Sequence, residues 1–325
     1  MQRDLIAIGG SAGSLDTLLS IAAAFPGNFT GNLFIAVHIG HGPSQLPGLL
    51  ARSGGLPASH PRDREPIRPG HIYVAPPGRH LLIEKEMLRL SRGPREHFTR
   101  PAIDPLFRSA AATYGARVIG VVLSGGGSDG AAGLDTIKRA GGRTVVLDPQ
   151  EAVFPDMPQA AVGIVAPDFV SLAGEIPGLL IRLARETVPA AQAAGEQTEA
   201  VAMPERPIAL TCPECGGALR RKGNGGGLQY RCHIGHALGA AEMLPAQLEA
   251  LEKALDVAQR ILNERIELAR NMIEDATAAG RTQGVGYWQK SQAEAERHIE
   301  AIRQMLSSIE ADSDQMEAVS AEPAK

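Results

Sequence analysis

The sequence predicts a doubly wound α/β domain, followed by a small cysteine-containing unit and an α-helical hairpin. Up to about residue 185, short apolar runs alternate with segments in which apolar residues have helical spacing. This alternation is typical of a mostly parallel sheet with helices on both faces. All three cysteines lie between residues 212 and 232, and after them apolar residues recur every three or four positions. The sheet is therefore expected first and the hairpin last.

The first strand is expected at Leu5–Ile8, and a glycine-rich turn follows it at once. This turn has the pattern G-x-S-x-G, with Gly9, Ser11 and Gly13 in the fixed places, and a helical pattern comes after it. In a nucleophile elbow the glycines allow a sharp bend that exposes the serine hydroxyl at the N-terminus of a helix. The partial positive charge there favours developing negative charge. Taken alone, the stretch could also be a phosphate-binding turn or a plain strand-to-helix turn.

The other elements of this domain follow in the same alternation. Strands are expected at Leu33–Val37, His71–Ala75, Val118–Leu123 and Thr144–Leu147, a small hairpin at Leu81–Ile83 and Leu88–Leu90, and helices at Asp104–Tyr114 and Ala131–Arg139. In such sheets ligands bind beyond the carboxyl ends of the strands. His38 ends the second strand, and Asp129 lies in the loop after the Val118 strand.

The three strand ends therefore carry a serine, a histidine and an aspartate. Ser11 would attack a carbonyl, His38 would take its proton and pass it to the leaving group, and Asp129 would orient the imidazole. Taken singly, His38 fits a core histidine better, and Asp129 could be a helix N-cap. The order Ser, His, Asp differs from that of α/β-hydrolases. The glycine-rich loop 125–128 could supply N–H donors to an oxyanion.

The same residues resemble the catalytic domain of the CheB protein-glutamate methylesterases. The resemblance covers about residues 1–185 and is carried by Ile6–Gly13, Val37–His38, Arg68–Pro76, Arg100–Phe107, Leu123–Gly133 and Val153–Pro158. It implies a doubly wound α/β domain with the triad Ser11, His38 and Asp129. It implies hydrolysis of γ-glutamyl methyl esters on the cytoplasmic helices of chemoreceptors, with deamidation of glutamine as a second activity. No cofactor is expected for this catalysis.

Some positions depart from the family's usual pattern. Many members have Thr at Ala12, Met at Gly126 and Asn at Ser128. Ala12 and Gly126 are the candidates for the oxyanion-binding turn and loop, because a backbone N–H needs no side chain. Loss of the Met is expected to loosen the loop. Members usually carry a phosphorylatable receiver domain before the esterase, and here the esterase motif begins at once, so we expect a regulatory partner in its place.

Composition limits the classes of partner. The net charge is −4 and the isoelectric point about 6.2, which gives no indication of nucleic-acid binding or of an anionic membrane surface. No apolar run approaches the ~20 residues that cross a bilayer, and no signal peptide is evident. Three cysteines do not suggest a disulfide framework. A cytoplasmic protein without membrane insertion is expected.

The cysteines have the spacing of a structural zinc ribbon. Residues 186–207 have a linker composition, and segment 208–240 then contains a C-x-x-C pair, a glycine-rich turn, and a third cysteine followed by histidines. Four thiolate and imidazole ligands around one Zn²⁺ would stabilise a segment too small to fold on its own core. The expected ligands are Cys212, Cys215, Cys232 and His236. His233 is the rival fourth ligand, and a redox C-x-x-C pair is the alternative function.

The last part is predicted to be a helical hairpin. Apolar residues recur at helical spacing over 241–311, with one break at Ala278–Gly280. Residues 312–325 are polar and are expected to form a disordered tail. Two further functions stay open from the sequence: a non-catalytic signalling adaptor, and a serine hydrolase that acts on another ester or amide.

Overall fold

The computed structural model describes residues 1–38, 42–189, 206–222, 228–280 and 284–320. The chain divides into two compact units, Met1–Glu242 and Met243–Lys325. The first unit therefore contains both the domain expected at 1–185 and the cysteine-containing segment. Most of the linker expected at 186–207 lies outside the described residues, as does the glycine-rich turn at 223–227.

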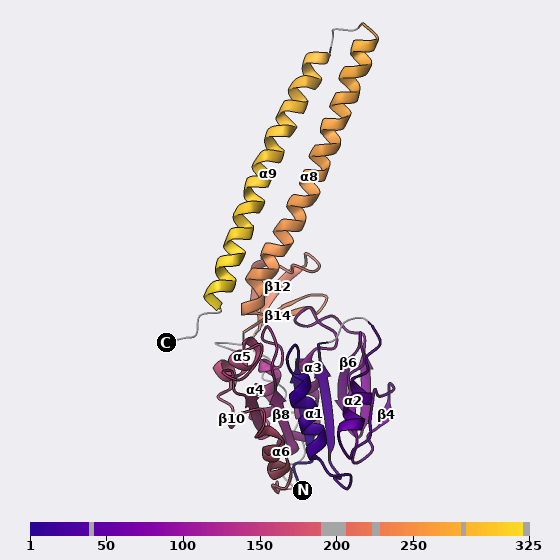
Figure 1. Ribbon diagram of the computed structural model, residues 1–325, viewed down its shortest axis with the longest axis vertical. Coiled ribbons are helices and arrows are strands. Elements are labelled where there is room, and N and C mark those ends of the chain that lie inside the picture. Colours follow the sequence, from indigo (N-terminus) through magenta and orange to yellow (C-terminus); the bar gives the residue numbers. More distant parts are fainter. Residues whose placement is uncertain (39–41, 190–205, 223–227, 281–283, 321–325) are drawn as a thin grey trace. The chain divides into compact units, whose positions relative to one another are not determined.

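The first unit is built on strands that alternate with helices (Figure 1). The strands of its α/β part are β1 (Leu5–Gly10), β2 (Asn32–Val37), β3 (Ala58–Ser59), β4 (Glu65–Pro66), β5 (Ile72–Val74), β6 (His80–Glu84), β7 (Met87–Ser91), β8 (Val118–Val122), β9 (Arg143–Leu147) and β10 (Phe169–Ser171). The helices are α1 (Leu15–Ala24), α2 (Leu46–Ser53), α3 (Ile103–Tyr114), α4 (Ala131–Arg139), α5 (Asp156–Val165) and α6 (Ile176–Ala184).

The main sheet has seven strands in the order β10-β9-β8-β1-β2-β5-β3, and all its paired strands run parallel. From β1 the chain first winds outward through β2 toward β5. It then returns to the other side of β1 at β8 and winds outward to β10. This confirms the doubly wound α/β fold. Because the strand order reverses around β1, the loops after β1, β2 and β8 meet at the topological switch point.

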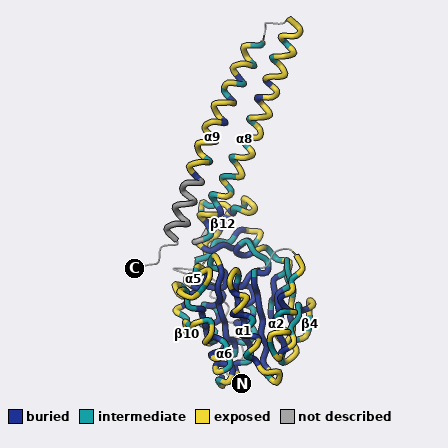
Figure 2. Tube along the Cα trace, in the orientation of Figure 1, coloured by how far each residue is buried: buried dark blue, intermediate teal, exposed yellow. Residues whose placement is uncertain are grey.

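The central strands are buried on both faces, which explains their continuous apolar runs. In β1, Ile6 and Ile8 face a core formed with helices α1, α2 and α6. Leu5 and Ala7 face the opposite core, formed with α3, α4 and α5 and with the β6–β7 hairpin. The dark blue parts of the tube in Figure 2 are the buried residues that form these two cores. Two separate apolar cores thus hold the strand ends of the main sheet in place.

Two smaller antiparallel sheets complete the first unit. One has the order β4-β7-β6 and contains the hairpin predicted near residues 81–90. The other has four strands in the order β11-β12-β13-β14. They are β11 (Arg206–Thr211), β12 (Ala218–Lys222), β13 (Gln229–Cys232) and β14 (Ala237–Gly239). We call residues 206–239 the ribbon segment. Cys212 and Cys215 lie in the turn between β11 and β12, and Cys232 is the last residue of β13.

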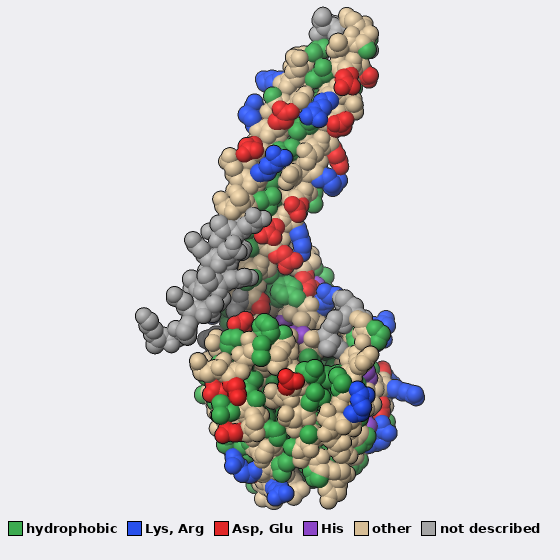
Figure 3. Space-filling view, viewed as in Figure 1, with side chains coloured by type: hydrophobic (Ala, Val, Ile, Leu, Met, Phe, Trp, Pro, Cys, Tyr) green, Lys and Arg blue, Asp and Glu red, His purple; other side chains and the backbone are tan. Residues whose placement is uncertain are grey.

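The second unit consists of two long helices that lie side by side (Figure 1). They are α8 (Ala240–Ala278), whose first turn belongs to the first unit, and α9 (Val285–Ser320). Ile266 of α8 packs against Ala295 and Ile299 of α9, which confirms the hairpin. Side chains of both charges are scattered over the face of it that Figure 3 shows. The helix α9 continues to Ser320, through most of the residues 312–325 for which a disordered tail was expected, because polar residues such as Glu and Gln do not interrupt a helix. The last five residues of that expected tail lie outside the described residues.

None of the described helices is long and apolar enough to cross a membrane.

Candidate active site

Ser11 lies in the turn between β1 and α1, and the two glycines of the motif make this turn possible. A Cβ on Gly9 would lie 2.3 Å from Cγ2 of Ile103, so only glycine lets α3 pack against the end of β1. Gly13 has φ +76°, and a Cβ there would lie 2.6 Å from Cβ of Val153. The motif is therefore a structural requirement of the turn as well as a sequence signature.

Hydrogen bonds fix the backbone on both sides of Ser11. Its N–H donates to the carbonyl of Ser124 at the end of β8, at 2.8 Å, and its carbonyl accepts the hydroxyl of Ser14 at 2.6 Å. Ser124 in turn donates its hydroxyl to the carbonyl of Ala12 at 2.8 Å. Ser11 itself is partly exposed. A serine that is held rigidly by its backbone and reaches solvent is what a nucleophile elbow requires.

His38 follows β2, the strand beside β1. The register pairs Gly10 with Val37, so the next residues along the two strands are Ser11 and His38. The N–H of His38 donates to the carbonyl of Gly10 at 3.2 Å, which extends the ladder to this residue. Nε2 of His38 lies 2.8 Å from Oδ2 of Asp129. The structure thus brings the predicted histidine and aspartate into direct contact, next to the predicted serine.

Asp129 is the buried member of this group, with 1% of its surface exposed. Besides His38, it accepts the N–H of Ile103 at 2.7 Å and the N–H of Asp104 at 3.0 Å, both from the first turn of α3. Burial alone would raise its pKa, but the charge of His97 and the contacts with His38 and Ile103 hold the pKa well below its usual range. Asp129 is thus an ionised carboxylate that can orient and stabilise an imidazolium.

The loop after β8 carries the candidate oxyanion donor. The N–H of Gly125 already donates to the carbonyl of Phe154 at 3.0 Å. Gly126, the next residue, therefore stays the candidate donor in this loop, as Ala12 does in the turn after Ser11. Ala12 is exposed, as a group that meets a substrate should be. Both assignments stay predictions.

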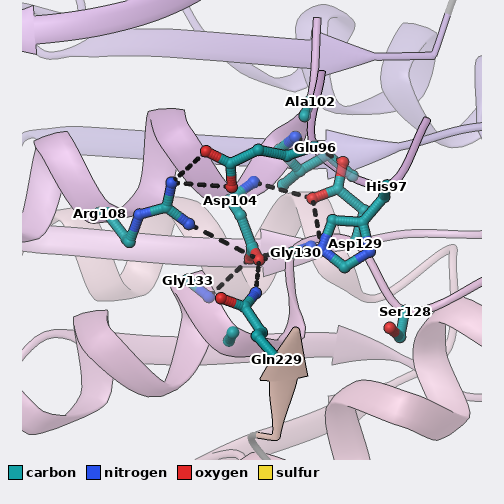
Figure 4. A network of polar contacts seen from close by, with 12 residues as sticks. Glu96, His97, Ala102, Asp104, Arg108, Ser128, Asp129, Gly130, Gly133 and Gln229 are labelled. Atoms are coloured by element: carbon teal, nitrogen blue, oxygen red, sulfur yellow. Dashed lines mark hydrogen bonds and ion pairs between the residues drawn. The ribbon is translucent and has the colours of Figure 1, made fainter. Parts of the chain in front are cut away.

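A second polar layer behind Asp129 was not foreseen from the sequence (Figure 4). Asp104 is fully buried, and its Oδ1 accepts the N–H groups of Gly130 and Gly133 at 3.1 and 2.7 Å. It therefore caps the N-terminus of α4 from a neighbouring helix. Its Oδ2 lies 3.2 Å from Nε2 of His97. No sequence motif indicates these contacts, because they join residues from separate segments of the chain.

His97 is a buried cation among carboxylates. Burial alone would lower its pKa, but the charge of Asp129 and the hydrogen bonds with Asp104 and Glu242 raise the pKa well above the ordinary value for histidine. Its φ of +51° is rare for a residue with a side chain. A position that is both strained and charged is held by its surroundings, and strain of this kind gathers near functional sites.

Comparison with known proteins shows the family of the chain. Residues 6–180 match the CheB methylesterase family. The chain belongs to this family. A protein-glutamate methylesterase/protein-glutamine glutaminase of Anaeromyxobacter dehalogenans is 38% identical over 183 residues, which make up 56% of this chain and 54% of that protein. A Leptospira interrogans protein named for the same two activities is 38% identical over 185 residues, 56% of this chain and 96% of its own length.

A solved structure supports the same assignment. The crystal structure of the Thermotoga maritima CheB methylesterase catalytic domain superposes with a TM-score of 0.53 and 29% identity, and the match covers 55% of this chain and 98% of that domain. The ribbon segment and the hairpin lie beyond the residues that match the CheB family.

The ribbon segment gathers the four predicted metal ligands. The ligand atoms of Cys212, Cys215, Cys232 and His236 all lie within 4.8 Å of one another. The Sγ atoms of Cys215 and Cys232 are 3.7 Å apart, and Nδ1 of His236 lies 3.7 Å from Sγ of Cys212 and 3.6 Å from Sγ of Cys232. Zinc–sulfur and zinc–nitrogen bonds of about 2.3 and 2.0 Å in a tetrahedron give edges of about 3.5–3.8 Å. The cluster has the size of a tetrahedral zinc site.

Contacts around the cluster favour His236 over His233 as the fourth ligand. Nε2 of His236 lies 3.0 Å from a carboxylate oxygen of Glu214, which leaves Nδ1 directed at the sulfur atoms. A second partner of this kind fixes the tautomer of a metal-binding histidine. His233 is exposed and lies over Gly217 instead. Burial raises the pKa of the Cys212 thiol to about 11, and a cation bound at the cluster would favour its thiolate form.

Proposed function

We propose that this chain is a protein-glutamate methylesterase that hydrolyses γ-glutamyl methyl esters of chemoreceptors through Ser11, His38 and Asp129. The observation that carries the proposal is the 2.8 Å contact between His38 and the buried Asp129, beside Ser11 at the switch point of a CheB-type sheet. A buried, ionised aspartate in contact with a histidine next to an exposed serine turn is the arrangement that serine hydrolases use.

The chemistry follows from these three groups. His38 removes the proton of Ser11 as the serine oxygen attacks the ester carbonyl, and the negative oxygen that forms is stabilised by backbone N–H groups, for which Ala12 and Gly126 are the candidates. His38 then gives the proton to the departing methoxide, and methanol leaves an acyl-enzyme. A water molecule, deprotonated by His38, attacks the acyl group and releases glutamate and the free serine.

The same route serves an amide. With a glutamine side chain as substrate, the proton from His38 goes to the leaving nitrogen, and ammonia departs in place of methanol. The curated relatives are named for both activities. We therefore propose glutamine deamidation as a second activity of the same three residues.

We propose the methylated cytoplasmic helical region of a chemoreceptor as the substrate, which makes the cytoplasm the compartment of action. The esterified glutamates of such a region project from the surface of a helix, and the partly exposed turn of Ser11 suits a macromolecular substrate. The net charge of −4 gives no support to a nucleic acid as partner.

The test is methanol release from receptor membranes that carry labelled methyl groups. We expect release by the wild-type protein and a loss of at least about 10³-fold in Ser11→Ala, because the nucleophile is gone. Ser53→Ala is the matched control, since this serine is exposed and donates its hydroxyl to the carbonyl of Leu49 within α2. Equal release by wild type and Ser11→Ala would refute the proposed nucleophile. No release by folded wild type would favour an adaptor, or a hydrolase of another ester.

We also propose that Cys212, Cys215, Cys232 and His236 hold a structural Zn²⁺. The cation would cross-link the two turns of the ribbon segment and supply no chemistry to the esterase. Its support is the tetrahedral size of the cluster and the contact between His236 and Glu214. A redox role for Cys212 and Cys215 has less support, because such a pair has no need of Cys232 and His236 nearby.

Metal analysis of the purified chain tests this site. We expect about one equivalent of zinc in the wild-type protein and its loss in Cys215→Ser, because a thiolate ligand is removed. His233→Ala is the matched control and should retain the metal. Retention of zinc by Cys215→Ser, or its loss in His233→Ala, would refute the proposed ligand set.

A further inference from the structure

The first turn of α8 reaches the loop that carries Asp129. Glu242, in that turn, accepts two hydrogen bonds through Oε1, one from the N–H of Ser128 at 2.7 Å and one from the hydroxyl of Ser128 at 2.6 Å. Ser128 directly precedes Asp129. Hydrogen bonds to a carboxylate are stronger than those between neutral groups. A single carboxylate therefore holds the residue next to the buried acid of the proposed triad.

The same oxygen is also linked to the triad through His97. Nδ1 of His97 lies 3.1 Å from Oε1 of Glu242, and the two side chains are 4% and 14% exposed. On the other side of the ring, Nε2 lies 3.2 Å from Oδ2 of Asp104 and 3.8 Å from Oδ1 of Asp129. The imidazole of His97 thus bridges Glu242 to Asp129, and it does so within a largely buried region.

The ribbon segment fits closely around this bridge. The N–H of His97 donates to the carbonyl of Ala237 at 2.8 Å, and Nε2 of Gln229 donates to Oδ2 of Asp104 at 2.8 Å. Figure 4 shows Gln229 pointing from β13 toward Asp104. A Cβ on Gly239 would lie 2.4 Å from Oε2 of Glu242. A Cβ at this position would also lie 2.5 Å from Oγ of Ser128, so alanine would displace the Glu242 carboxylate and the Ser128 hydroxyl from their present places.

A bound cation would be another explanation for the clustering of His97, Asp104 and Asp129, and it has less support. Ligand atoms of His97, Asp104 and Asp129 do lie within 4.8 Å of one another. However, the oxygen atoms of Asp129 already accept the N–H groups of Ile103 and Asp104, and His97 is itself held as a cation by the carboxylates. Hydrogen bonds and charge pairing thus account for the cluster.

We infer that Glu242 is a positioning residue for the esterase, which fixes Ser128 and His97 and through them the carboxylate that orients His38. The inference rests on the proposed triad and extends it, because it gives residues outside the CheB-matched region a part in the geometry of the site. Removal of Glu242 would leave donors of Ser128 and His97 without their acceptor in a buried place, so the loop should shift. A displacement of about 1 Å can lower a rate by about 100-fold.

The experiment compares four full-length variants with the wild type. Glu242→Ala removes the acceptor, and Glu242→Gln keeps an oxygen in nearly the same place. Gly239→Ala keeps every polar group, but its methyl group would displace the carboxylate of Glu242 and the hydroxyl of Ser128. Glu249→Ala is the matched control, because that glutamate is 64% exposed and pairs with Lys253, one turn further along α8. Metal content and thermal unfolding identify any variant that fails to fold.

Two readouts follow the triad itself. The first is the rate at which a fluorophosphonate labels Ser11; the serine oxygen bonds to phosphorus, fluoride leaves, and His38 takes the proton. The second is the NMR signal of the ring nitrogens of His38, which reports the contact with Asp129. The kcat and KM for methyl-ester hydrolysis are measured beside them. A group that acts only on positioning should change kcat and leave KM nearly constant.

We expect labelling and kcat to fall about tenfold or more in Glu242→Ala and in Gly239→Ala, with partial recovery in Glu242→Gln and no change in Glu249→Ala. The His38 signals should shift in the first two variants. Unchanged labelling and unchanged His38 signals in folded Glu242→Ala would overturn the inference. If wild-type Ser11 is not labelled, the proposed triad is wrong, and the His38 signals alone then decide whether Glu242 sets the position of Asp129.

Discussion

The α/β part and the ribbon segment belong to one compact unit, yet different forces hold them together. The α/β part has two large apolar clusters, one on each face of the main sheet. Among the residues of the ribbon segment whose burial is described, the buried apolar ones are Leu219, Ala237 and Leu238, together with two of the cysteines. Full burial of one large apolar side chain contributes about 1.5–3 kcal/mol, whereas ordering one residue of backbone costs about 1–2 kcal/mol.

This difference supports the proposed metal in the ribbon segment. The buried apolar side chains among its described residues contribute too little to offset the cost of ordering four short strands. Binding of structural zinc contributes about 10–16 kcal/mol in small zinc-dependent domains, which is enough to decide whether such a segment folds. The α/β part needs no such contribution. The comparison predicts that the two regions respond differently to the same treatment.

The largest expected effect is therefore that of a zinc chelator on the ribbon segment. Amide hydrogen exchange should become fast in β11–β14 once the metal is removed, because the thiolates and His236 lose their common partner. Exchange in β1, β2 and β8 should stay slow, because their two apolar cores are untouched. Mass spectrometry of peptides from both regions, with and without chelator, measures the contrast.

Two controls sharpen that experiment. His233→Ala should behave like the wild type, and Cys232→Ser should show fast exchange in the ribbon segment without any chelator. Slow exchange in β11–β14 after complete removal of the metal would mean that contacts with the α/β part, such as that of Gln229 with Asp104, are enough to hold the segment.

A smaller effect is expected at Glu242, which follows the ribbon segment and contacts Ser128 and His97 of the α/β part. This effect depends on pH. Burial alone would raise the pKa of Glu242, but the hydrogen bond and charge of His97 and the hydrogen bonds from Ser128 lower the pKa to about 2 from 4.5. Ionised Glu242 therefore stabilises the fold above about pH 4.5, and this contribution is lost as the pH falls toward about 2. His97 has a raised pKa, so its contribution is complete below about pH 6.5 and is lost as the pH rises through its folded value.

The measurement is the free energy of unfolding of the wild type and of Glu242→Gln at a series of pH values. The difference should be greatest between about pH 4.5 and 6.5, where Glu242 is ionised and His97 is protonated. The charged groups around His97 are Asp104 on α3, Asp129 on the loop, and Glu242 on α8. A difference that stays constant down to about pH 3 would show that the Glu242–His97 contact does not stabilise the folded state.

The sequence predicted the α/β fold and the contact between His38 and Asp129 because both depend on local patterns. Apolar runs mark the buried strands, and a parallel sheet brings the carboxyl ends of its central strands together whatever the loops contain. The Cys–His spacing predicted the members of the cluster in the same way. Helix α9 extends further than expected, since polarity alone does not end a helix.

The layer behind Asp129 could not be predicted from such patterns. Asp104 and His97 have no signature motif, and their roles depend on how α3 and the preceding loop pack against α4. Glu242 is 114 residues away from Ser128 along the chain. In the sequence it is one of many glutamates near the start of a polar helix, and only the fold shows that it is largely buried. Contacts between distant segments of this kind need a structure.

The smallest expected effect compares one glycine from each region. Gly216 in the ribbon segment and Gly78 in the α/β part both have φ +69°, and a Cβ on either would meet no atom of the described residues within 4 Å. Alanine at either position therefore adds only backbone strain, about 1–2 kcal/mol.

In Gly216→Ala this strain should weaken zinc binding about tenfold, because folding of the turn and metal binding are coupled. In Gly78→Ala it should lower the free energy of unfolding of the α/β part and leave zinc affinity unchanged. Competition with a zinc indicator and chemical denaturation measure the two effects. Equal zinc affinity in both variants would mean that the turn at Gly216 is already held without the metal.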